Sequence, residues 1–208
     1  MMVCFTAIAA IGIAAAQDAG VERTQVRGMA AVYPWVFDNG NETSRTMAVS
    51  TAEEIARKAG YSTVPDDVAN SSWNSNNYRY PEWDHLPNRS TIRSYGRAVK
   101  ADVVLYGTVS WHTRSIWVDA GPRTVSTATV AVNVLDVRTG RIVYTKHGVG
   151  RSDEDTNNVK LAADILLTPL VTAVSGGPAT PQEQRAVQVA LGRAYRGWIY
   201  PQGNVQTF

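Results

Sequence analysis

The chain has 208 residues, of which 44% are hydrophobic and 18% are charged. This composition is typical of one globular domain and excludes wholesale disorder. Its 20 basic and 18 acidic residues leave a formal net charge of only +2. So small a net charge excludes a broad positively charged surface of the kind that binds nucleic acid. We therefore expect no nucleic-acid partner.

The first sixteen residues have the features of a secretory signal peptide. Residues 1–16 (MMVCFTAIAAIGIAAA) carry no charge and end in three alanines, although no Lys or Arg precedes the apolar run. The run is shorter than the roughly 20 residues that span a bilayer. We therefore expect cleavage near Gln17, a periplasmic or secreted mature chain without a membrane span, and a flexible leader over 17–27. Cys4, the single cysteine, would leave with the signal peptide.

The following segments predict a strand, a helix and a second strand. Residues 29–37 (MAAVYPWVF) are apolar and β-prone, and Pro34 places the later part of this strand at a sheet edge or a strand end. Apolar residues recur at helical spacing over 48–59, and Gly60 supplies a left-handed cap. A short strand over 61–64 completes this part.

Residues 65–90 are rich in Asn, Ser and Pro and predict a long loop. We expect Trp83 to be packed, because Pro81 and Pro87 stiffen the chain around it, and Trp73 to be exposed. A short helix follows the loop, with Ser90 as its cap and with Ile92, Tyr95 and Val99 facing inward.

A run of three or four antiparallel strands is expected next. The pattern predicts separate strands over 102–110 and 111–118, with turn residues at 119–122. Valines alternate with polar residues over 129–134, which indicates a half-buried strand. A short turn (RTGR) then leads into a strand over 142–149.

The C-terminal part predicts helices. An apolar stripe over 159–170 indicates one of them. Thr180, Pro181 and Glu183 form a capping box with Pro at the first helical position, which predicts a helix over 180–198.

These elements predict one α/β domain over 28–200, followed by a tail over 201–208. Its fold would be a single mixed sheet that contains a run of antiparallel strands and is flanked by about four helices.

Motifs for catalysis and for metal or cofactor binding are not found in the sequence. It contains no G-x-S-x-G elbow, no H-E-x-x-H helix and no Gly-rich phosphate loop. His85, His112 and His147 do not stand at metal-ligand spacing from one another. We therefore predict a protein that is not an enzyme, with no catalytic residues, no metal and no cofactor.

Aromatic residues in polar surroundings are the candidate binding residues. They either cover the sheet edge or form a recognition surface for a protein or a glycan. The candidates are Trp73, Tyr78, Tyr80, Trp83, Trp111 and Trp117.

Four segments, taken in order, resemble the periplasmic α/β module of the CsgG-type curli secretion family. Relatives of that family include the N-terminal domain of TolB and the outer-membrane activators of penicillin-binding proteins. The segments are AVYPWVFDN at 31–39, AEEIARKAGYSTVP at 52–65, KADVVLYGTV at 100–109 and VLDVRTGRIVYT at 134–145. The resemblance covers about residues 29–175.

The resemblance implies the module without the secretion pore. No cysteine stands at the start of the mature chain for lipidation, and no long amphipathic strand pairs are inserted. It implies an exported, non-catalytic accessory or assembly protein of the cell envelope that acts through protein contacts, with an envelope protein or a second copy as partner. The alternatives are a glycan- or peptidoglycan-binding module that uses the loop aromatics, and a hydrolase whose site is assembled from distant residues.

Overall fold

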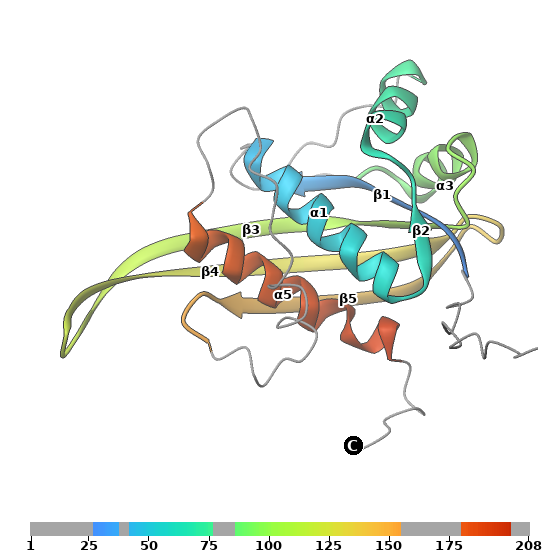
Figure 1. Ribbon diagram of the computed structural model, residues 1–208. Coiled ribbons are helices and arrows are strands. Elements are labelled where there is room, and N and C mark those ends of the chain that lie inside the picture. Colours follow the sequence, from blue (N-terminus) through green and yellow to red (C-terminus); the bar gives the residue numbers. More distant parts are fainter. Residues whose placement is uncertain (1–26, 38–41, 77–85, 155–179, 201–208) are drawn as a thin grey trace, which may run out of the picture.

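The computed structural model describes residues 27–37, 42–76, 86–154 and 180–200. They form one five-stranded mixed sheet with helices against both faces (Figure 1). The elements are β1 (Gly28–Phe37), α1 (Glu42–Lys58), β2 (Tyr61–Thr63), α2 (Asp66–Ser75), α3 (Arg89–Ala98), β3 (Val103–Val118), β4 (Gly121–Asp136), β5 (Arg141–Arg151) and α5 (Pro181–Ile199).

The sheet is mixed, with strand order β2-β1-β3-β4-β5. β1 pairs in parallel with β2 and with β3, whereas β3, β4 and β5 form an antiparallel run. The predicted α/β class is confirmed, together with its mixed sheet, its antiparallel run and its four helices among the described residues.

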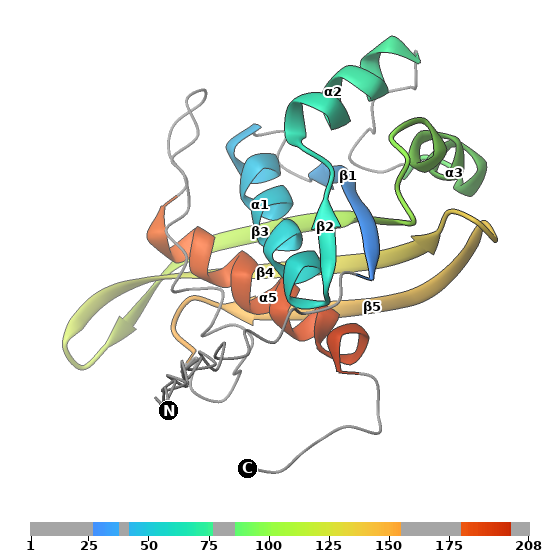
Figure 2. The ribbon, with the colours of Figure 1, turned by 45° about the vertical axis from the view of Figure 1, so that its right-hand side comes forward.

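The first core lies between the sheet and the helices α1 and α5, which lie side by side on one face (Figure 2). Every apolar position of the predicted α1 stripe is buried, and Gly60 ends the helix at φ 87° as a left-handed cap requires. The large residues that fill this core are Trp35, Ile55, Leu105, Leu191 and Tyr195.

Helix α5 begins at the predicted capping box. The Thr180 hydroxyl accepts a hydrogen bond from the Glu183 N–H, and the Glu183 carboxylate accepts one from the Thr180 N–H at 2.8 Å. Such a cap stabilises a helix by about 1 kcal/mol. The inward face of the helix carries Val187, Leu191 and Ala194, which are fully buried.

The second core lies on the opposite face, under α2 and α3, and is built around three aromatic rings. Trp73 packs edge-on against Tyr33 and Tyr95, with ring centroids 5.2 and 5.1 Å away. Ile92 and Val99 of the α3 segment are buried here as predicted.

Three predictions for 65–90 are wrong. The segment contains helix α2, and Trp73 is 0% exposed instead of lying on the surface. Ala69 and Trp73 stand four residues apart and therefore lie on one helix face, which packs inward despite the polar residues around it. The cap of α3 is Asn88 instead of Ser90, because its side chain accepts a hydrogen bond from the Thr91 N–H at 2.9 Å.

The segments predicted as separate strands over 102–110 and 111–118 form one continuous strand, β3, whose partner is β4. The prediction that Pro34 places the later part of its strand at a sheet edge or a strand end agrees with the structure in one respect. β2 pairs with β1 only as far as Ala30, so Pro34, which has no N–H to donate, lies where β1 has β3 alone beside it.

Several predicted segments lie outside the described residues: the signal peptide, almost all of the leader, the helix over 159–170 and the tail. No helix of the described part is long and apolar enough to cross a membrane.

Candidate interaction surface

The antiparallel strands β3 and β4 run beyond the rest of the sheet. Pairing between β1 and β3 ends where Phe37 lies opposite Val109, and pairing between β4 and β5 begins where Thr127 lies opposite Arg151. Beyond these points β3 and β4 are described as pairing only with each other, over 111–118 and 121–126. We call these residues the ribbon; it projects from the body of the molecule (Figure 1).

The ribbon ends in an exposed tryptophan. Trp117 is 82% exposed and lies opposite Pro122, and its neighbour Val118 is 41% exposed. An exposed side chain of this size adds nothing to a core, and tryptophan is enriched at the centres of protein interfaces. The tip therefore has the chemistry of a contact surface.

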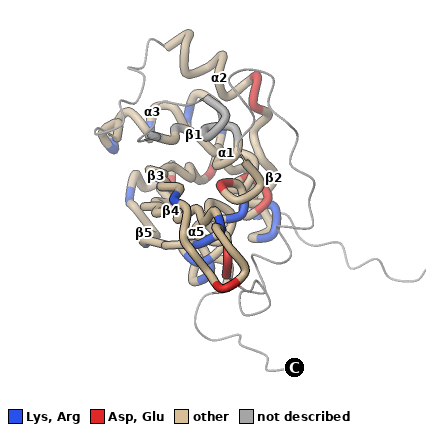
Figure 3. The backbone as a smooth tube through the Cα atoms, turned by 90° about the vertical axis from the view of Figure 1, so that its left-hand side faces the viewer, with Lys and Arg blue, Asp and Glu red and all other residues tan. Residues whose placement is uncertain are grey.

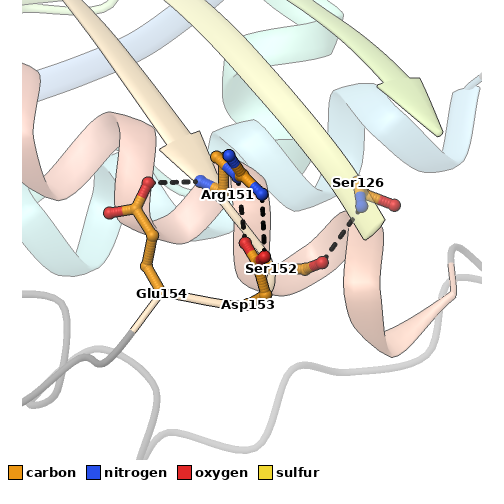
Figure 4. A network of polar contacts seen from close by, with 5 residues as sticks. All are labelled: Ser126, Arg151, Ser152, Asp153 and Glu154. Atoms are coloured by element: carbon orange, nitrogen blue, oxygen red, sulfur yellow. Dashed lines mark hydrogen bonds and ion pairs between the residues drawn. The ribbon is translucent and has the colours of Figure 1, made fainter. Parts of the chain in front are cut away.

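Polar contacts hold the base of the ribbon (Figure 4). The Ser126 N–H donates to the Ser152 hydroxyl at 3.0 Å, and the Ser152 N–H donates to the Ser126 carbonyl at 2.9 Å. Both serines are buried. On the ribbon itself, the Thr113 hydroxyl lies 2.8 Å from the Ser126 hydroxyl and 3.4 Å from the Glu183 carboxylate on α5.

The same region contains a chain of ion pairs that joins β5 to α5. The Arg151 guanidinium binds both carboxylate oxygens of Asp153 at 3.0 and 2.8 Å, which lowers the pKa of Asp153. The Glu154 carboxylate accepts from the Arg151 N–H at 3.1 Å and pairs with Arg193. These contacts fix the ribbon's base against the first core, so the tip is presented on an ordered support.

The candidate aromatic residues do not come together as one surface in the described structure. Trp73 belongs to the second core, and Trp111 is half-buried against the first core. Trp117 stands alone at the tip of the ribbon. Tyr78, Tyr80 and Trp83 lie outside the described residues, so their part in binding stays a prediction.

The structure adds a surface that the sequence analysis did not single out. Val109 and Val130 point into the first core, so the residues next to them in β3 and β4 point to the other face of the sheet. The part of that face beyond α3 carries mostly polar side chains, and we call this part the open face. Its members are Thr108, Ser110, His112 and Arg114 of β3, Arg123, Val125, Thr127, Thr129, Ala131 and Asn133 of β4, and Thr145, His147, Val149 and Arg151 of β5. Val125 is buried among them.

The open face carries charge of one sign. The sequences of β3 and β5 contain no Asp or Glu, and β4 contains only Asp136 at its last residue. Helix α3, at one end of this face, has three arginines and no acidic residue, whereas acidic residues lie on α1 and α2 (Figure 3). A sequence signal existed: the alternation of Val with Thr, Ser and His along these strands separates the two faces.

The geometry also bears on the catalytic alternative. The buried serines Ser126 and Ser152 are hydrogen-bonded to each other through the Ser126 backbone, and the Ser126 hydroxyl lies beside the Thr113 hydroxyl, which is not a base. A serine nucleophile requires a general base within hydrogen-bond reach. Within the part of the chain that the structure describes, no group of three His, Cys, Asp or Glu side chains is placed to hold a metal ion.

Comparison with known proteins finds solved structures whose backbones overlap part of this one. A lipoprotein from Neisseria meningitidis is 18% identical, with 67% of this chain and 94% of that chain covered and a TM-score of 0.47. The C-terminal domain of LpoB from Salmonella enterica is 16% identical (62% and 85% covered, TM-score 0.42). The PelC dodecamer from Paraburkholderia phytofirmans is 18% identical (69% and 86% covered, TM-score 0.39).

No family model and no curated protein matches the chain. The resemblance to the CsgG-type module therefore stays a prediction from the four sequence segments.

Proposed function

We propose that this chain is an exported, non-catalytic accessory protein of the cell envelope that acts through protein contacts, and that the ribbon makes the contact. The observation that carries the proposal is the exposure of Trp117, 82%, at the end of a ribbon that projects from the sheet. Export rests on the signal-peptide features of residues 1–16.

The ribbon suits a protein partner for two physical reasons. Burial of a tryptophan removes a large apolar area from water, worth roughly 25 cal/mol for each Å². The ribbon's outer edges, along 111–118 of β3 and 121–125 of β4, are not described as paired with another strand, whereas the Ser126 backbone is bonded to Ser152. Such edges can accept a strand from a partner, whose main-chain hydrogen bonds then add affinity.

Nothing in the described structure favours the alternatives over this function. Glycan recognition by stacking calls for several aromatic rings that converge on one site, whereas Trp73, Trp111 and Trp117 are dispersed. A hydrolase would need a positioned base beside a nucleophile, and the serine network described above is structural.

Site-specific photo-crosslinking tests the proposal. The chain from Gln17 onward, with a photoreactive phenylalanine analogue in place of Ala120 at the ribbon turn, is irradiated in envelope extract of its native host. We expect one discrete protein adduct, which Trp117→Ala abolishes. Tyr200→Ala is the matched control, because Tyr200 is also an exposed aromatic residue (51%) but follows α5, away from the ribbon.

Mass spectrometry of the adduct identifies the partner, and an adduct of twice the chain mass identifies a second copy. Equal crosslinking by wild type and by Trp117→Ala would show that the ribbon tip does not make the contact.

A further inference from the structure

The open face differs from an ordinary solvated sheet face in its charge. One face of an antiparallel sheet commonly faces water and then carries polar residues. Such a face needs polarity but not a single charge sign, because residues of both signs are equally well hydrated. Here the charged members are Arg114, Arg123 and Arg151. The Arg151 guanidinium binds Asp153, and Arg123 lies near enough to the same carboxylate to help lower its pKa, so one acidic group offsets part of the positive charge of the three arginines.

Arg114 and Arg123 stand close together on this face. Arg114 lies opposite Val125, and Arg123 is two residues from Val125 on the same strand, so the two arginines are diagonal neighbours. Diagonal positions on one face of a sheet are about 7–8 Å apart, and like charges at such distances repel each other. The strands keep both arginines on one face, and Asp153 offsets only part of their charge, which leaves a net positive site that a further anion would neutralise.

Less polar residues lie further along the same face, four or more residues down β4 from the position opposite Arg114. Val149 is 49% exposed and occupies the same face, and the half-buried Ala131 lies one row away from it. A protein interface typically has an apolar centre and a charged or polar rim, and the open face reproduces that arrangement. Single-stranded nucleic acid is typically bound by stacking on large aromatic side chains, and the members of the open face include no Phe, Tyr or Trp.

We infer that the open face binds an acidic protein surface, with Arg114 and Arg123 as the main charged contacts. This inference rests on the proposed function, because it states the chemistry of the partner that the ribbon contacts. The inference requires that the affinity for an acidic partner decrease as the salt concentration rises, because salt screens exposed charges over about 10 Å at 0.1 M.

Fluorescently labelled poly-L-glutamate is the probe, and fluorescence anisotropy at 50 mM and 300 mM NaCl is the measurement. We expect binding at low salt that weakens at least tenfold in Arg114→Glu/Arg123→Glu. The matched control is Arg27→Glu/Arg196→Glu, which changes the net charge equally at two exposed sites, one before β1 and one on α5. It should weaken binding less than threefold.

A second variant guards against misfolding of the first. Thr129→Glu places a carboxylate at an exposed position of the open face and leaves both arginines in place. It should also weaken binding, and circular dichroism of each variant verifies its fold. Equal weakening by the two arginine double variants would mean that only net charge matters and would overturn the inference. Binding of polygalacturonate without binding of poly-L-glutamate would overturn it in favour of an acidic glycan.

The crosslinking experiment separates this inference from the proposed function. Suppose that Trp117→Ala abolishes the adduct while Arg114→Glu/Arg123→Glu leaves it intact. The ribbon contact then stands and the acidic chemistry fails. If the arginine variant abolishes the adduct and Trp117→Ala does not, the open face stands and the ribbon tip fails.

Discussion

The protonation of Glu53 depends strongly on the fold. This residue lies on α1 with a side chain that is 18% exposed, and it shares a hydrogen bond with the Asp66 carboxyl of α2. Burial raises its pKa from 4.5 to about 7, and the charge of Asp66 adds to the effect while Arg57 opposes it. A protonated Glu53 can donate to Asp66, whereas two carboxylates repel each other.

The free energy of unfolding should therefore decrease between about pH 4.5 and pH 7 because of Glu53. The folded state binds the proton more tightly than the unfolded state, so the stabilisation is complete below pH 4.5 and is lost as the pH rises through 7. One pKa unit corresponds to about 1.4 kcal/mol, and sharing of the proton with Asp66 reduces the total to about 1–3 kcal/mol. Urea unfolding of the wild type at pH 4.5 and pH 8 measures this change.

Glu53→Gln should remove the pH dependence and be the more stable protein at pH 8, because the amide donates to Asp66 without a charge. Glu54→Gln is the neighbouring control, since Glu54 pairs with Arg57 at 2.9 Å. It should keep the dependence of the wild type. An unchanged pH profile in Glu53→Gln would show that another group causes the effect.

The two tryptophans Trp73 and Trp117 should respond oppositely to truncation. Trp73→Ala leaves a cavity between Tyr33 and Tyr95 and should cost about 3–5 kcal/mol of unfolding free energy. Trp117→Ala removes a side chain that is 82% exposed and should change stability by less than about 0.5 kcal/mol. Denaturant midpoints compare them, and equal midpoints would contradict the placement of Trp73 in the second core.

At the scale of elements, two glycines of β5 allow α5 to lie directly on the sheet. A Cβ at Gly150 would meet the Ala186 carbonyl oxygen and the Ala190 nitrogen of α5, and one at Gly148 would meet the Ala190 carbonyl oxygen. These are backbone atoms, so the helix as a whole would have to move. Small residues in β5 thus set the distance between the helix and the strand.

Gly150→Ala should therefore destabilise the protein by about 2–3 kcal/mol, as overpacking of a core does. Gly197→Ala is the matched change on α5, where the new methyl group would meet the Tyr144 side chain and no backbone atom, at 3.1 Å from its hydroxyl, so a shift of a few tenths of an ångström would accommodate it. It should be nearly neutral, because alanine also favours the helix. Thermal unfolding compares the two, and similar melting temperatures would mean that α5 can shift at little cost.

At the scale of the whole molecule, the sheet separates two cores of unequal size. The first core joins α1 and α5 to the three strands β1, β3 and β4, and the second joins α2 and α3 to one end of the sheet. Local opening is least costly where few apolar residues are buried. The α2–α3 layer should therefore open at a lower free energy than the α1–α5 layer.

Amide hydrogen exchange with mass spectrometry measures this difference. Peptides from α2 and α3 should exchange before peptides from the buried turns of α1 and α5, and Trp73→Ala should accelerate only the former. Exchange of both layers at one rate would show that the molecule opens as a single unit.

Local sequence patterns were sufficient to predict the helices and strands that are marked by a periodic arrangement of apolar residues or by a capping motif. The stripe of α1, the capping box of α5 and the alternation of β4 each depend on neighbours within a few residues. Their placement in a mixed α/β sheet followed from the order of helices and strands. The face of α2 was missed because two apolar residues, Ala69 and Trp73, stand among polar ones.

The candidate site depended on the tertiary structure. The two strands β3 and β4 are covered where β1 and β5 lie beside them, and they are exposed beyond the ends of β1 and β5. Nothing in the sequence of β3 or β4 marks where β1 and β5 end. Trp73 and Trp117 are likewise both tryptophans near polar residues, yet one is 0% and the other 82% exposed. Periodicity assigns a side chain to one face of its element, but the elements that cover that face come from distant parts of the chain.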